Sequence, residues 1–324
     1  MDEKIQLPKN LEGKTVFIAG VAGFIGSHLA EFYLNLGAKV LGVDNFITGS
    51  QSNIDYLSAY PRFEFIKCDI VVRLPNLKSK KIDYVFDMAS PASPIDFSEL
   101  PLEIMRVNSE GVLNLLEMAK DKKARFLLSS TSEVYGDPEV HPQTESYLGH
   151  VNCIGPRSCY DESKRFAEAL TMTFLNHYGV DTRIVRIFNT YGPRMRPNDG
   201  RVIPNFITQA MKNEDITLYG DGSQTRSFCY VSDLVNAIHT VMFSNDHTPF
   251  NIGNPDEYTI KEAGEFIIKT LKSNSKIVFS ELPKDDPKQR RPDLSKLQAV
   301  SDYKPLVSFE DGLRKTAEYF SKNF

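Results

Sequence analysis

The stretch KTVFIAGVAGFIGSHLAEF, residues 14–32, determines the fold that we expect for this chain. An apolar run rich in β-branched residues is followed by Gly20, Gly23 and Gly26 and then by a helical pattern. Glycines in such a turn permit positive φ and a close approach of the backbone to a pyrophosphate, to which the helix N-terminus offers free N–H groups. This order of strand, turn and helix favours dinucleotide binding, and a tight structural turn is the alternative.

Strand-like runs alternate with helical patterns through the first half of the chain. After the first strand, we expect strands within residues 39–44, 63–69, 82–90, 124–131 and 183–192. These runs are nearly continuous in apolar residues, as in strands that helices cover on both faces. The sequence therefore predicts an α/β fold with a Rossmann-type, doubly wound parallel sheet. Long helices are expected over residues 24–37 and 103–120.

The composition and pattern of the sequence change after about residue 190, where loops rich in Gly, Pro, Asp and Arg separate short helical patterns. We predict a dinucleotide-binding domain over residues 1–190 and, over residues 191–324, mainly a smaller C-terminal substrate-binding lobe. The lobe is expected over the carboxyl ends of the strands, where open α/β sheets bind ligands. The boundary is soft, and we expect the chain to cross back.

Two acidic strand ends identify the dinucleotide. Asp44 ends the second expected strand, 18 residues after Gly26, where a carboxylate can bind both ribose hydroxyls of an adenosine and repel a 2′-phosphate. The third expected strand ends at Asp69 and Ile70, which can hold the adenine. These residues favour NAD over NADP as the cofactor. A role as a turn residue at the strand end is the alternative for Asp44.

The stretch CYDESKR, residues 159–165, places Tyr160 and Lys164 on one face of an expected helix. Thr131, 29 residues before Tyr160, ends the fifth expected strand. Removing hydride from a secondary alcohol needs a base for the hydroxyl proton, and a nearby ammonium would lower the tyrosine pKa for that task. We predict Tyr160 as the base, Lys164 as its electrostatic partner and Thr131 as a hydrogen-bonding helper.

Bulk properties exclude several classes of function. The formal net charge is −4 without a long basic run, so nothing indicates binding to nucleic acid or to an anionic membrane. The printed N-terminus has no apolar signal sequence, and no apolar run is long enough to span a bilayer, so we expect a cytoplasmic protein. The four cysteines lack CxxC spacing and are expected as reduced thiols, and no metal site is expected.

The GxxGxxG spacing and the Tyr-x-x-x-Lys pair are typical of the extended short-chain dehydrogenase/reductase superfamily. Longer segments resemble the UDP-glucuronic acid decarboxylases, also called UDP-xylose synthases, over nearly the whole chain from about residue 12. The matching segments are DMASPASP (87–94), TSEVYGDPEVHPQ (131–143), NCIGPRSCYDESKR (152–165), RIFNTYGPRMRPNDGRV (186–202), YGDGSQTRSFCYVSDLV (219–235), NIGNP (251–255) and DDPKQRRPD (285–293).

This resemblance implies a reaction in three stages. Carbon 4 of UDP-glucuronic acid is oxidised by NAD, the resulting β-keto acid loses CO2, and re-reduction gives UDP-xylose. By resemblance, Glu133 and Ser132 serve the decarboxylation and reprotonation, although Glu133 could also only cap a turn. The remaining expected cofactor contacts are Phe24, Ile25, Asn45, Ala89, Ser90, Tyr160 and Lys164, whose amine can also bind the nicotinamide ribose.

The expected substrate contacts are Asn189, Arg201, Tyr219, Arg226 and Arg290. Arginine can bind a phosphate or a carboxylate through two hydrogen bonds, which suits a UDP-sugar acid. Charge alone does not decide between Arg290 and its neighbour Arg291, and the family pattern favours Arg290. Solvated loop charge is the alternative for each arginine. Two positions depart from the family, because Phe97 stands where a tyrosine is frequent and Leu148 where a tryptophan is frequent.

Other functions stay open at this level. A 4,6-dehydratase, an epimerase or a decarboxylase that releases the 4-keto sugar would share the first step, although Ser132 argues against a dehydratase. A silent dinucleotide sensor would have lost the base, whereas Tyr160 and Lys164 are both present. The resemblance also implies a homodimer through a four-helix bundle built from the helices near 104–120 and from Tyr160 onward. These helices could instead bury their apolar stripes within the monomer.

Overall fold

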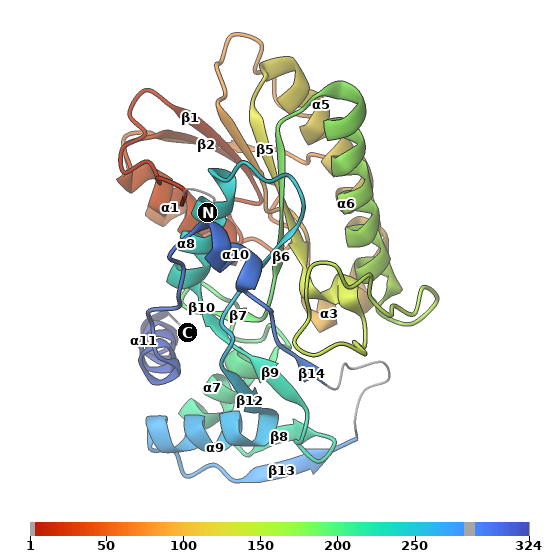
Figure 1. The fold of residues 1–324 in the computed structure, drawn as a ribbon. Coiled ribbons are helices and arrows are strands. Elements are labelled where there is room, and N and C mark those ends of the chain that lie inside the picture. Colours follow the sequence, from red (N-terminus) through yellow and green to blue (C-terminus); the bar gives the residue numbers. More distant parts are fainter. Residues whose placement is uncertain (1–3, 282–288, 324) are drawn as a thin grey trace.

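The glycine-rich stretch begins on an inner strand of a seven-stranded parallel sheet in the computed structural model, which describes residues 4–281 and 289–323 (Figure 1). The strand order is β11-β6-β5-β4-β1-β2-β3. Reversed, it is the doubly wound order 3-2-1-4-5-6 with one added edge strand, so the predicted fold class is confirmed. The strands are β1 (Thr15–Ala19), β2 (Lys39–Asp44), β3 (Phe63–Lys67), β4 (Tyr84–Asp87), β5 (Arg125–Thr131), β6 (Thr182–Ile187) and β11 (Phe250–Ile252).

The six predicted strands are all present in this sheet, but the seventh was not predicted. Strand β11 has only three residues and comes long after residue 190. It pairs with β6 in parallel, with Phe250 opposite Val185. The chain therefore returns to the large sheet after leaving it, and the division at residue 190 stays a prediction.

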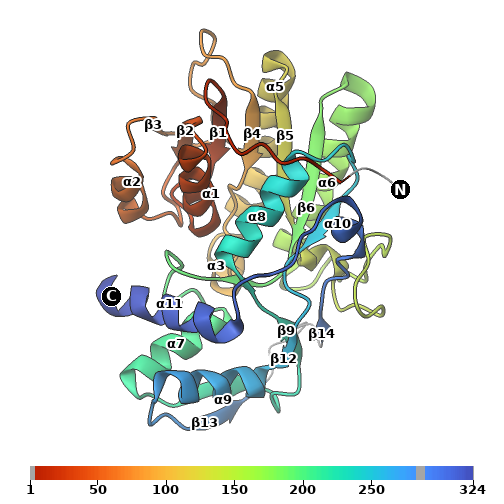
Figure 2. The same cartoon turned by 60° about the vertical axis from the view of Figure 1, so that its left-hand side comes forward.

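Helices cover both faces of the sheet, as the continuous apolar strands require (Figure 2). Three helices and a short one beside β11 pack on one face, and a second group packs on the other. The first group is α1 (Phe24–Asn35), α2 (Gln51–Leu57), α8 (Val231–Met242) and α10 (Ser295–Val300). The second group is α4 (Pro101–Arg106), α5 (Val112–Lys122) and α6 (Ser158–Tyr178), with α3 (Pro94–Glu99) beside α4.

The helix expected over residues 103–120 is present but not regular. A π-helical turn, η1 (Val107–Gly111), joins α4 to α5. Gly111 in this turn packs close to Ile70, since a Cβ there would lie 3.0 Å from the Ile70 Cδ1 atom. The wider turn also buries Asn108 completely. A helical period alone does not reveal such a π turn.

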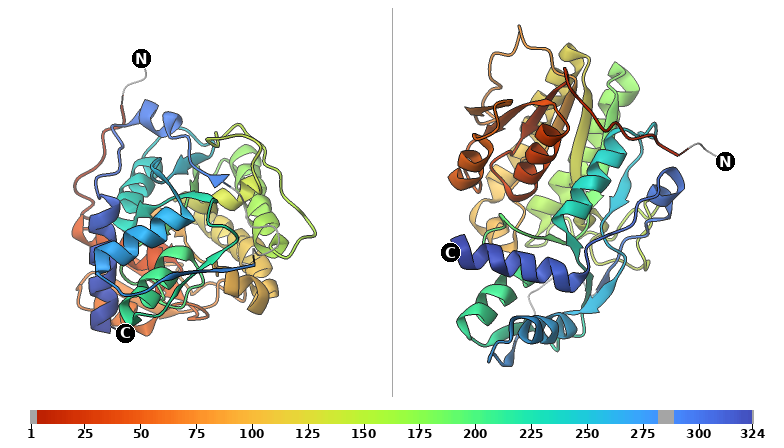
Figure 3. Two further views of the ribbon diagram at one scale, coloured as in Figure 1. Left: turned by 90° about the horizontal axis from the view of Figure 1, so that it is seen from below. Right: turned by 90° about the vertical axis from the view of Figure 1, so that its left-hand side faces the viewer.

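The C-terminal lobe lies beyond the carboxyl ends of the large sheet (Figures 1 and 3). A short parallel pair, β7 with β10, leads into it, and two small sheets with three helices form it. Its strands are β8 (Ile216–Tyr219) with β13 (Ile277–Ser280), and β12 (Glu257–Thr259), β9 (Thr225–Ser227) and β14 (Gln289–Arg290). Its helices are α7 (Val202–Lys212), α9 (Ile260–Leu271) and α11 (Phe309–Asn323), and the pair is β7 (Thr190–Tyr191) and β10 (Cys229–Tyr230).

The glycine turn between β1 and α1 has no room for larger side chains. Gly20 has φ +79°, and a Cβ on it would lie 2.5 Å from the Met88 carbonyl oxygen. A Cβ on Gly26 would lie 2.1 Å from the Gly20 carbonyl oxygen. The first and third glycines are thus required by φ and by the close packing of α1 against the strand ends.

No helix in the described ranges is long and apolar enough to cross a membrane.

Candidate active site

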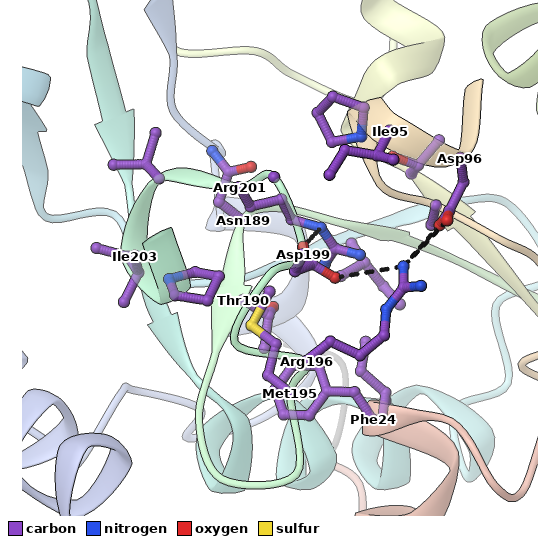
Figure 4. A pocket seen from close by; sticks show the side chains of 18 of the residues that line it. Phe24, Ile95, Asp96, Asn189, Thr190, Met195, Arg196, Asp199, Arg201 and Ile203 are labelled. Atoms are coloured by element: carbon purple, nitrogen blue, oxygen red, sulfur yellow. Dashed lines mark hydrogen bonds and ion pairs between the residues drawn. The ribbon is translucent and has the colours of Figure 1, made fainter. Parts of the chain in front are cut away.

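A cavity of about 770 Å³ lies between the carboxyl ends of the large sheet and the lobe. The glycine turn after β1, the loop after β4 and the end of β5 form one wall. The opposite wall comes from the lobe, chiefly from the loop that leads into α7 (Figure 4). This is the crevice where the strand order reverses, the place at which doubly wound sheets bind their ligands.

The N-terminus of α1 opens into this cavity. Gly20 and residues 22–26 line the wall, so the predicted residues Gly23, Phe24, Ile25 and Gly26 all belong to it. Among the residues that the structure describes, no side chain caps this helix, and its first turn carries no acid. The first N–H groups of α1 are therefore available to an anion, in a position where the helix dipole is positive.

The predicted adenosine contacts cluster beside the glycine turn but are not wall residues. Asp44 accepts hydrogen bonds from the backbone N–H groups of Ala22 at 3.0 Å and Phe46 at 2.7 Å. Its neighbour Asn45 donates to the Asp69 carboxylate at 3.2 Å. The Asn45 backbone also contributes a hydrogen bond, and a carboxylate, which offers about four acceptor sites, keeps capacity for a further bond. Of the predicted cofactor residues in the described chain, five do not line the cavity: Asp44, Asn45, Asp69, Ile70 and Ala89.

Tyr160 and Thr131 meet at the cavity wall. Thr131 ends β5 and Tyr160 lies in the first turn of α6, and their side chains form a hydrogen bond. The Tyr160 ring stacks on Phe97 with the centroids 4.9 Å apart. Burial raises the pKa of Tyr160 well above its usual range, and the bond to Thr131 opposes this only partly. The charge of Arg201 also lowers this pKa, whereas Glu133 and Asp161 raise it, and the predicted effect of Lys164 on Tyr160 stays a prediction.

Lys164 is 2% exposed and lies one helical turn beyond Tyr160. Its ammonium donates to the Ser129 carbonyl at 2.8 Å, at the end of β5, and not to the tyrosine. Burial lowers the pKa of Lys164, while the nearby carboxylates of Asp87 and Glu168 oppose this. Burial raises the pKa of Asp87 itself to about 6, and one of its carboxylate oxygens has no hydrogen-bond partner among the described residues.

Glu133 lies near the Tyr160 side chain, between two arginines. Arg157 donates to its carboxylate at 2.7 Å, and Arg290 forms an ion pair with it from the lobe. Arg290 also donates to the Gly136 carbonyl at 2.9 Å and lies 3.4 Å from the Ser132 hydroxyl. Burial would raise the pKa of Glu133, but the two guanidinium groups hold it well below its usual range.

All five predicted substrate residues line the cavity, together with Ser90, Thr131, Ser132 and Glu133. Asn189 directly precedes β7, Arg201 is the N-cap residue of α7, Tyr219 ends β8, Arg226 lies in β9 and Arg290 in β14. Arg291 is not a wall residue, and its backbone pairs with Gln143 instead. Part of the segment PKDDPKQRRPD, residues 283–288, lies outside the described residues.

Sequence reasoning missed several polar groups of this wall. Arg157, three residues before Tyr160, holds Glu133, and Arg196 and Asp199 face the cavity from the loop before α7. The segments that contain them were recognised, but no motif separates such residues from solvated loop charge. Asn108 was also missed, although it bridges the hydroxyls of Ser90 and Ser163 at 3.1 Å from each.

Comparisons with known proteins agree with this geometry. The model of the NAD dependent epimerase/dehydratase family matches residues 16–253. The chain belongs to the NAD-dependent epimerase/dehydratase family. The expected relationship to extended short-chain dehydrogenases/reductases is thereby confirmed.

Within this epimerase/dehydratase family, the chain is 48% identical over 309 residues to a Danio rerio protein named UDP-glucuronic acid decarboxylase 1, covering 95% of this chain and 73% of that protein. It is 46% identical over 306 residues to UDP-glucuronic acid decarboxylase 6 of Arabidopsis thaliana, covering 94% and 88%. Its fold is similar to that of UDP-glucuronic acid 4-epimerase from Bacillus cereus, solved with UDP-glucuronic acid and NAD. That comparison gives a TM-score of 0.86 at 28% identity and covers 96% of this chain and 100% of the other.

Proposed function

We propose that this protein is an NAD-dependent UDP-glucuronate decarboxylase, which converts UDP-glucuronic acid to UDP-xylose through a 4-keto intermediate. One observation carries the proposal: the pair Thr131–Tyr160, the buried Lys164 and the Glu133–Arg290 ion pair line one cavity. The chain's similarity to named decarboxylases over 95% of its length supports this substrate and this outcome.

The glycine turn and the strand ends fit NAD. The N–H groups of the α1 N-terminus would bind the pyrophosphate, and Asp44 keeps acceptor capacity for the ribose hydroxyls. Among the described residues Lys164 donates one of its three hydrogens, to the Ser129 carbonyl, and it can donate others to the nicotinamide ribose. NAD bound there would supply the hydride acceptor for carbon 4 of the sugar and, once reduced, the hydride donor for the last stage.

Tyr160 is proposed to take the proton from the hydroxyl on carbon 4. Since burial raises its pKa, the phenol is protonated at neutral pH in the protein alone. The phenol must therefore first lose its proton to solvent, and the hydrogen bond to Thr131 and the charge of Arg201 lower the cost of forming the phenolate. The positive charge of Lys164, held within one helical turn, favours the phenolate that forms.

Glu133 is proposed to act as an orienting carboxylate. Two arginines hold its pKa well below the usual range, so it remains ionised at neutral pH and is not itself the proton donor. A β-keto acid loses CO2 readily because the electrons of the broken bond enter an enolate. Glu133 and the Ser132 hydroxyl can then position a water that protonates carbon 5, with Arg290 fixing both groups, and the hydroxide left behind passes to solvent.

The charge of the cavity favours an anionic sugar nucleotide. Seven cationic side chains line it against three carboxylates, although the whole chain has a net charge of −4. The cations are Arg157, Lys164, Arg194, Arg196, Arg201, Arg226 and Arg290, and the carboxylates are Asp96, Glu133 and Asp199. A diphosphate together with a sugar carboxylate would find complementary charge here, and arginine can bind either group through two hydrogen bonds.

Incubation of the protein with UDP-glucuronic acid and NAD, followed by mass analysis of the nucleotide sugar, tests the proposal. We expect a loss of about 44 mass units, the mass of CO2. An unchanged mass with a new retention time would indicate an epimerase. A product that lacks two further hydrogens, with NADH accumulating, would indicate release of the 4-keto pentose. Either result would replace the proposed reaction.

We also propose a cytoplasmic homodimer formed through α4, α5 and α6. Exposed apolar side chains on these helices support it: Leu102, Met105, Leu113 and Phe166 are 40–68% exposed. Four free cysteines are in keeping with a reducing compartment. Size measurement by light scattering checks the dimer, which Phe166→Glu is expected to dissociate, whereas Leu306→Glu, at another exposed apolar position, is not.

A further inference from the structure

The loop before α7 carries a buried carboxylate into the cavity. Asp199 is 4% exposed, and its carboxylate lies between Arg201 and Arg196 (Figure 4). The Arg201 Nε atom is 2.8 Å from Oδ1 of Asp199, and the Arg196 Nη2 atom is 3.8 Å from Oδ2. The mechanism proposed above gives Asp199 no task, although Arg201 is one of the predicted substrate contacts.

The contact between Asp199 and Arg201 is electrostatic and poorly directed. Oδ1 and Nε lie at hydrogen-bonding distance, yet neither of these buried atoms has a hydrogen-bond partner in the described chain. Burial raises the pKa of Asp199, and the guanidinium groups of Arg201 and Arg196 oppose the shift. The charged form of the carboxylate is thus favoured mainly by arginines that a ligand could also use, with a smaller contribution from a hydrogen bond of the Arg201 backbone.

The loop does not depend on this contact for its position. Arg196 donates to both oxygens of Asp96, at 3.1 and 2.9 Å, and lies 3.3 Å from the Ser93 hydroxyl. Ser93 and Asp96 form the capping box of α3, on the other wall of the cavity. Replacing the Asp199 carboxylate by an amide would leave this connection between the walls intact.

We propose that Asp199 is an internal competitor for the anionic group of the sugar nucleotide. In the ligand-free protein its carboxylate is paired with the Arg201 guanidinium. This contact must break when an anionic oxygen of the ligand binds to that guanidinium. Asp199 thereby weakens the binding of substrate and of product, and it speeds product release. The inference deepens the proposed function and rests on it for the identity of the ligand.

Asp199 differs from the other two carboxylates of the cavity in its partners. Glu133 receives a directed hydrogen bond from Arg157, and Asp96 receives bonds from Arg196 and from the backbone of Ser93. Of these three wall carboxylates in the described chain, only Asp199 receives no directed hydrogen bond from any guanidinium. It is thus the one that a phosphate or carboxylate oxygen can replace most readily.

The test is calorimetric titration of the NAD-saturated protein with UDP. The variant Asp199→Asn is expected to bind UDP about tenfold more tightly than the wild type, a usual size for coupling between competing groups. Glu310→Gln serves as the matched control, because it removes the same charge from an exposed ion pair on α11. Its affinity for UDP is expected to equal that of the wild type.

A double-mutant cycle separates competition from a change of structure. When Arg201→Gln is already present, Asp199→Asn is expected to add no further gain, because the contested guanidinium is gone. A gain that persists without Arg201 would overturn the inference, as would unchanged or weaker binding of all ligands by Asp199→Asn. If the asparagine variant does not fold, Asp199→Ser in the same cycle supplies the measurement.

Two further titrations identify the competing anion. A gain with UDP assigns the diphosphate to Arg201, whereas a gain seen only with UDP-glucuronic acid, measured in the Tyr160→Phe background, assigns the sugar carboxylate. UDP binding needs no turnover. If the gain occurs in a protein that releases no CO2, the proposed reaction fails and the inference stands. If the protein releases CO2 and shows no gain, the proposed reaction stands and the inference fails.

Discussion

Replacing Asp87 with asparagine should remove a pH dependence from the stability of the protein. Asp87 ends β4, is completely buried, and has a pKa raised from 3.8 to about 6 by that burial. The folded protein therefore binds the proton more tightly than the unfolded chain. The contribution of Asp87 to the free energy of unfolding is most favourable below pH 3.8 and falls as the pH rises to about 6. Above that pH the full cost of burying the charged carboxylate is present.

The size of the effect follows from the shift. Two pKa units correspond to about 3 kcal/mol, so the free energy of unfolding of Asp87→Asn relative to wild type should rise by about that amount between pH 4 and pH 7. Urea denaturation across this range measures it, with Glu310→Gln as an exposed control. Other buried acids titrate in both proteins and cancel in the difference. If the two curves run parallel, Asp87 ionises in the folded protein as it does in the unfolded chain, and the reasoning is wrong.

Three other substitutions test the site. Tyr160→Phe should lower turnover about 10²- to 10⁴-fold while a fluorescence titration shows unchanged NAD binding; turnover within tenfold of wild type would remove this residue as the base. Arg157→Leu should lower the free energy of unfolding by about 3 kcal/mol, because the buried Glu133 carboxylate loses a partner, and adding Glu133→Gln should restore part of it; no recovery would contradict the ion-pair account. Gly26→Ala should weaken NAD binding more than tenfold, since its Cβ would lie 2.1 Å from a carbonyl oxygen; Gly264→Ala, with ordinary contacts, should not, and equal titrations for both would refute the packing argument.

The large sheet could be predicted from the sequence because its first six strands are marked locally. Each is a continuous apolar run next to a turn or a helical pattern, so period and length suffice. Strand β11 has three residues, FNI, and forms only because β6 offers an open edge beside it. Such a strand depends on a partner more than sixty residues away, which no local pattern records.

The candidate site was predictable where a motif fixes both residue type and spacing. The glycines, Thr131, Tyr160 and Lys164 belong to such motifs, and all of them line the cavity. The predicted adenosine contacts lie beside the cavity and not in its wall. Arg157 and Asp199 are recognisable only in the folded chain. The partner of Arg157, Glu133, comes from another segment, and the role of Asp199 depends on the burial of its carboxylate. Arginine in a polar loop is more often a solvated charge.

The environment of a recognised residue was harder to predict than its position. The spacing places Lys164 one helical turn from Tyr160, but it does not reveal that the ammonium donates to the Ser129 carbonyl or that burial raises the pKa of Tyr160. Burial depends on what packs over the ring, here Phe97, and a sequence motif contains no such information.

The most direct test of the account follows the carboxylate carbon itself. UDP-glucuronic acid labelled with ¹³C at the carboxyl group is incubated with the protein and NAD, while NMR records labelled CO2 and the sugar product and absorbance records NADH. The account predicts labelled CO2 and UDP-xylose in equal amounts with no net NADH. Label that stays on the nucleotide sugar, whether or not carbon 4 is inverted, would contradict it.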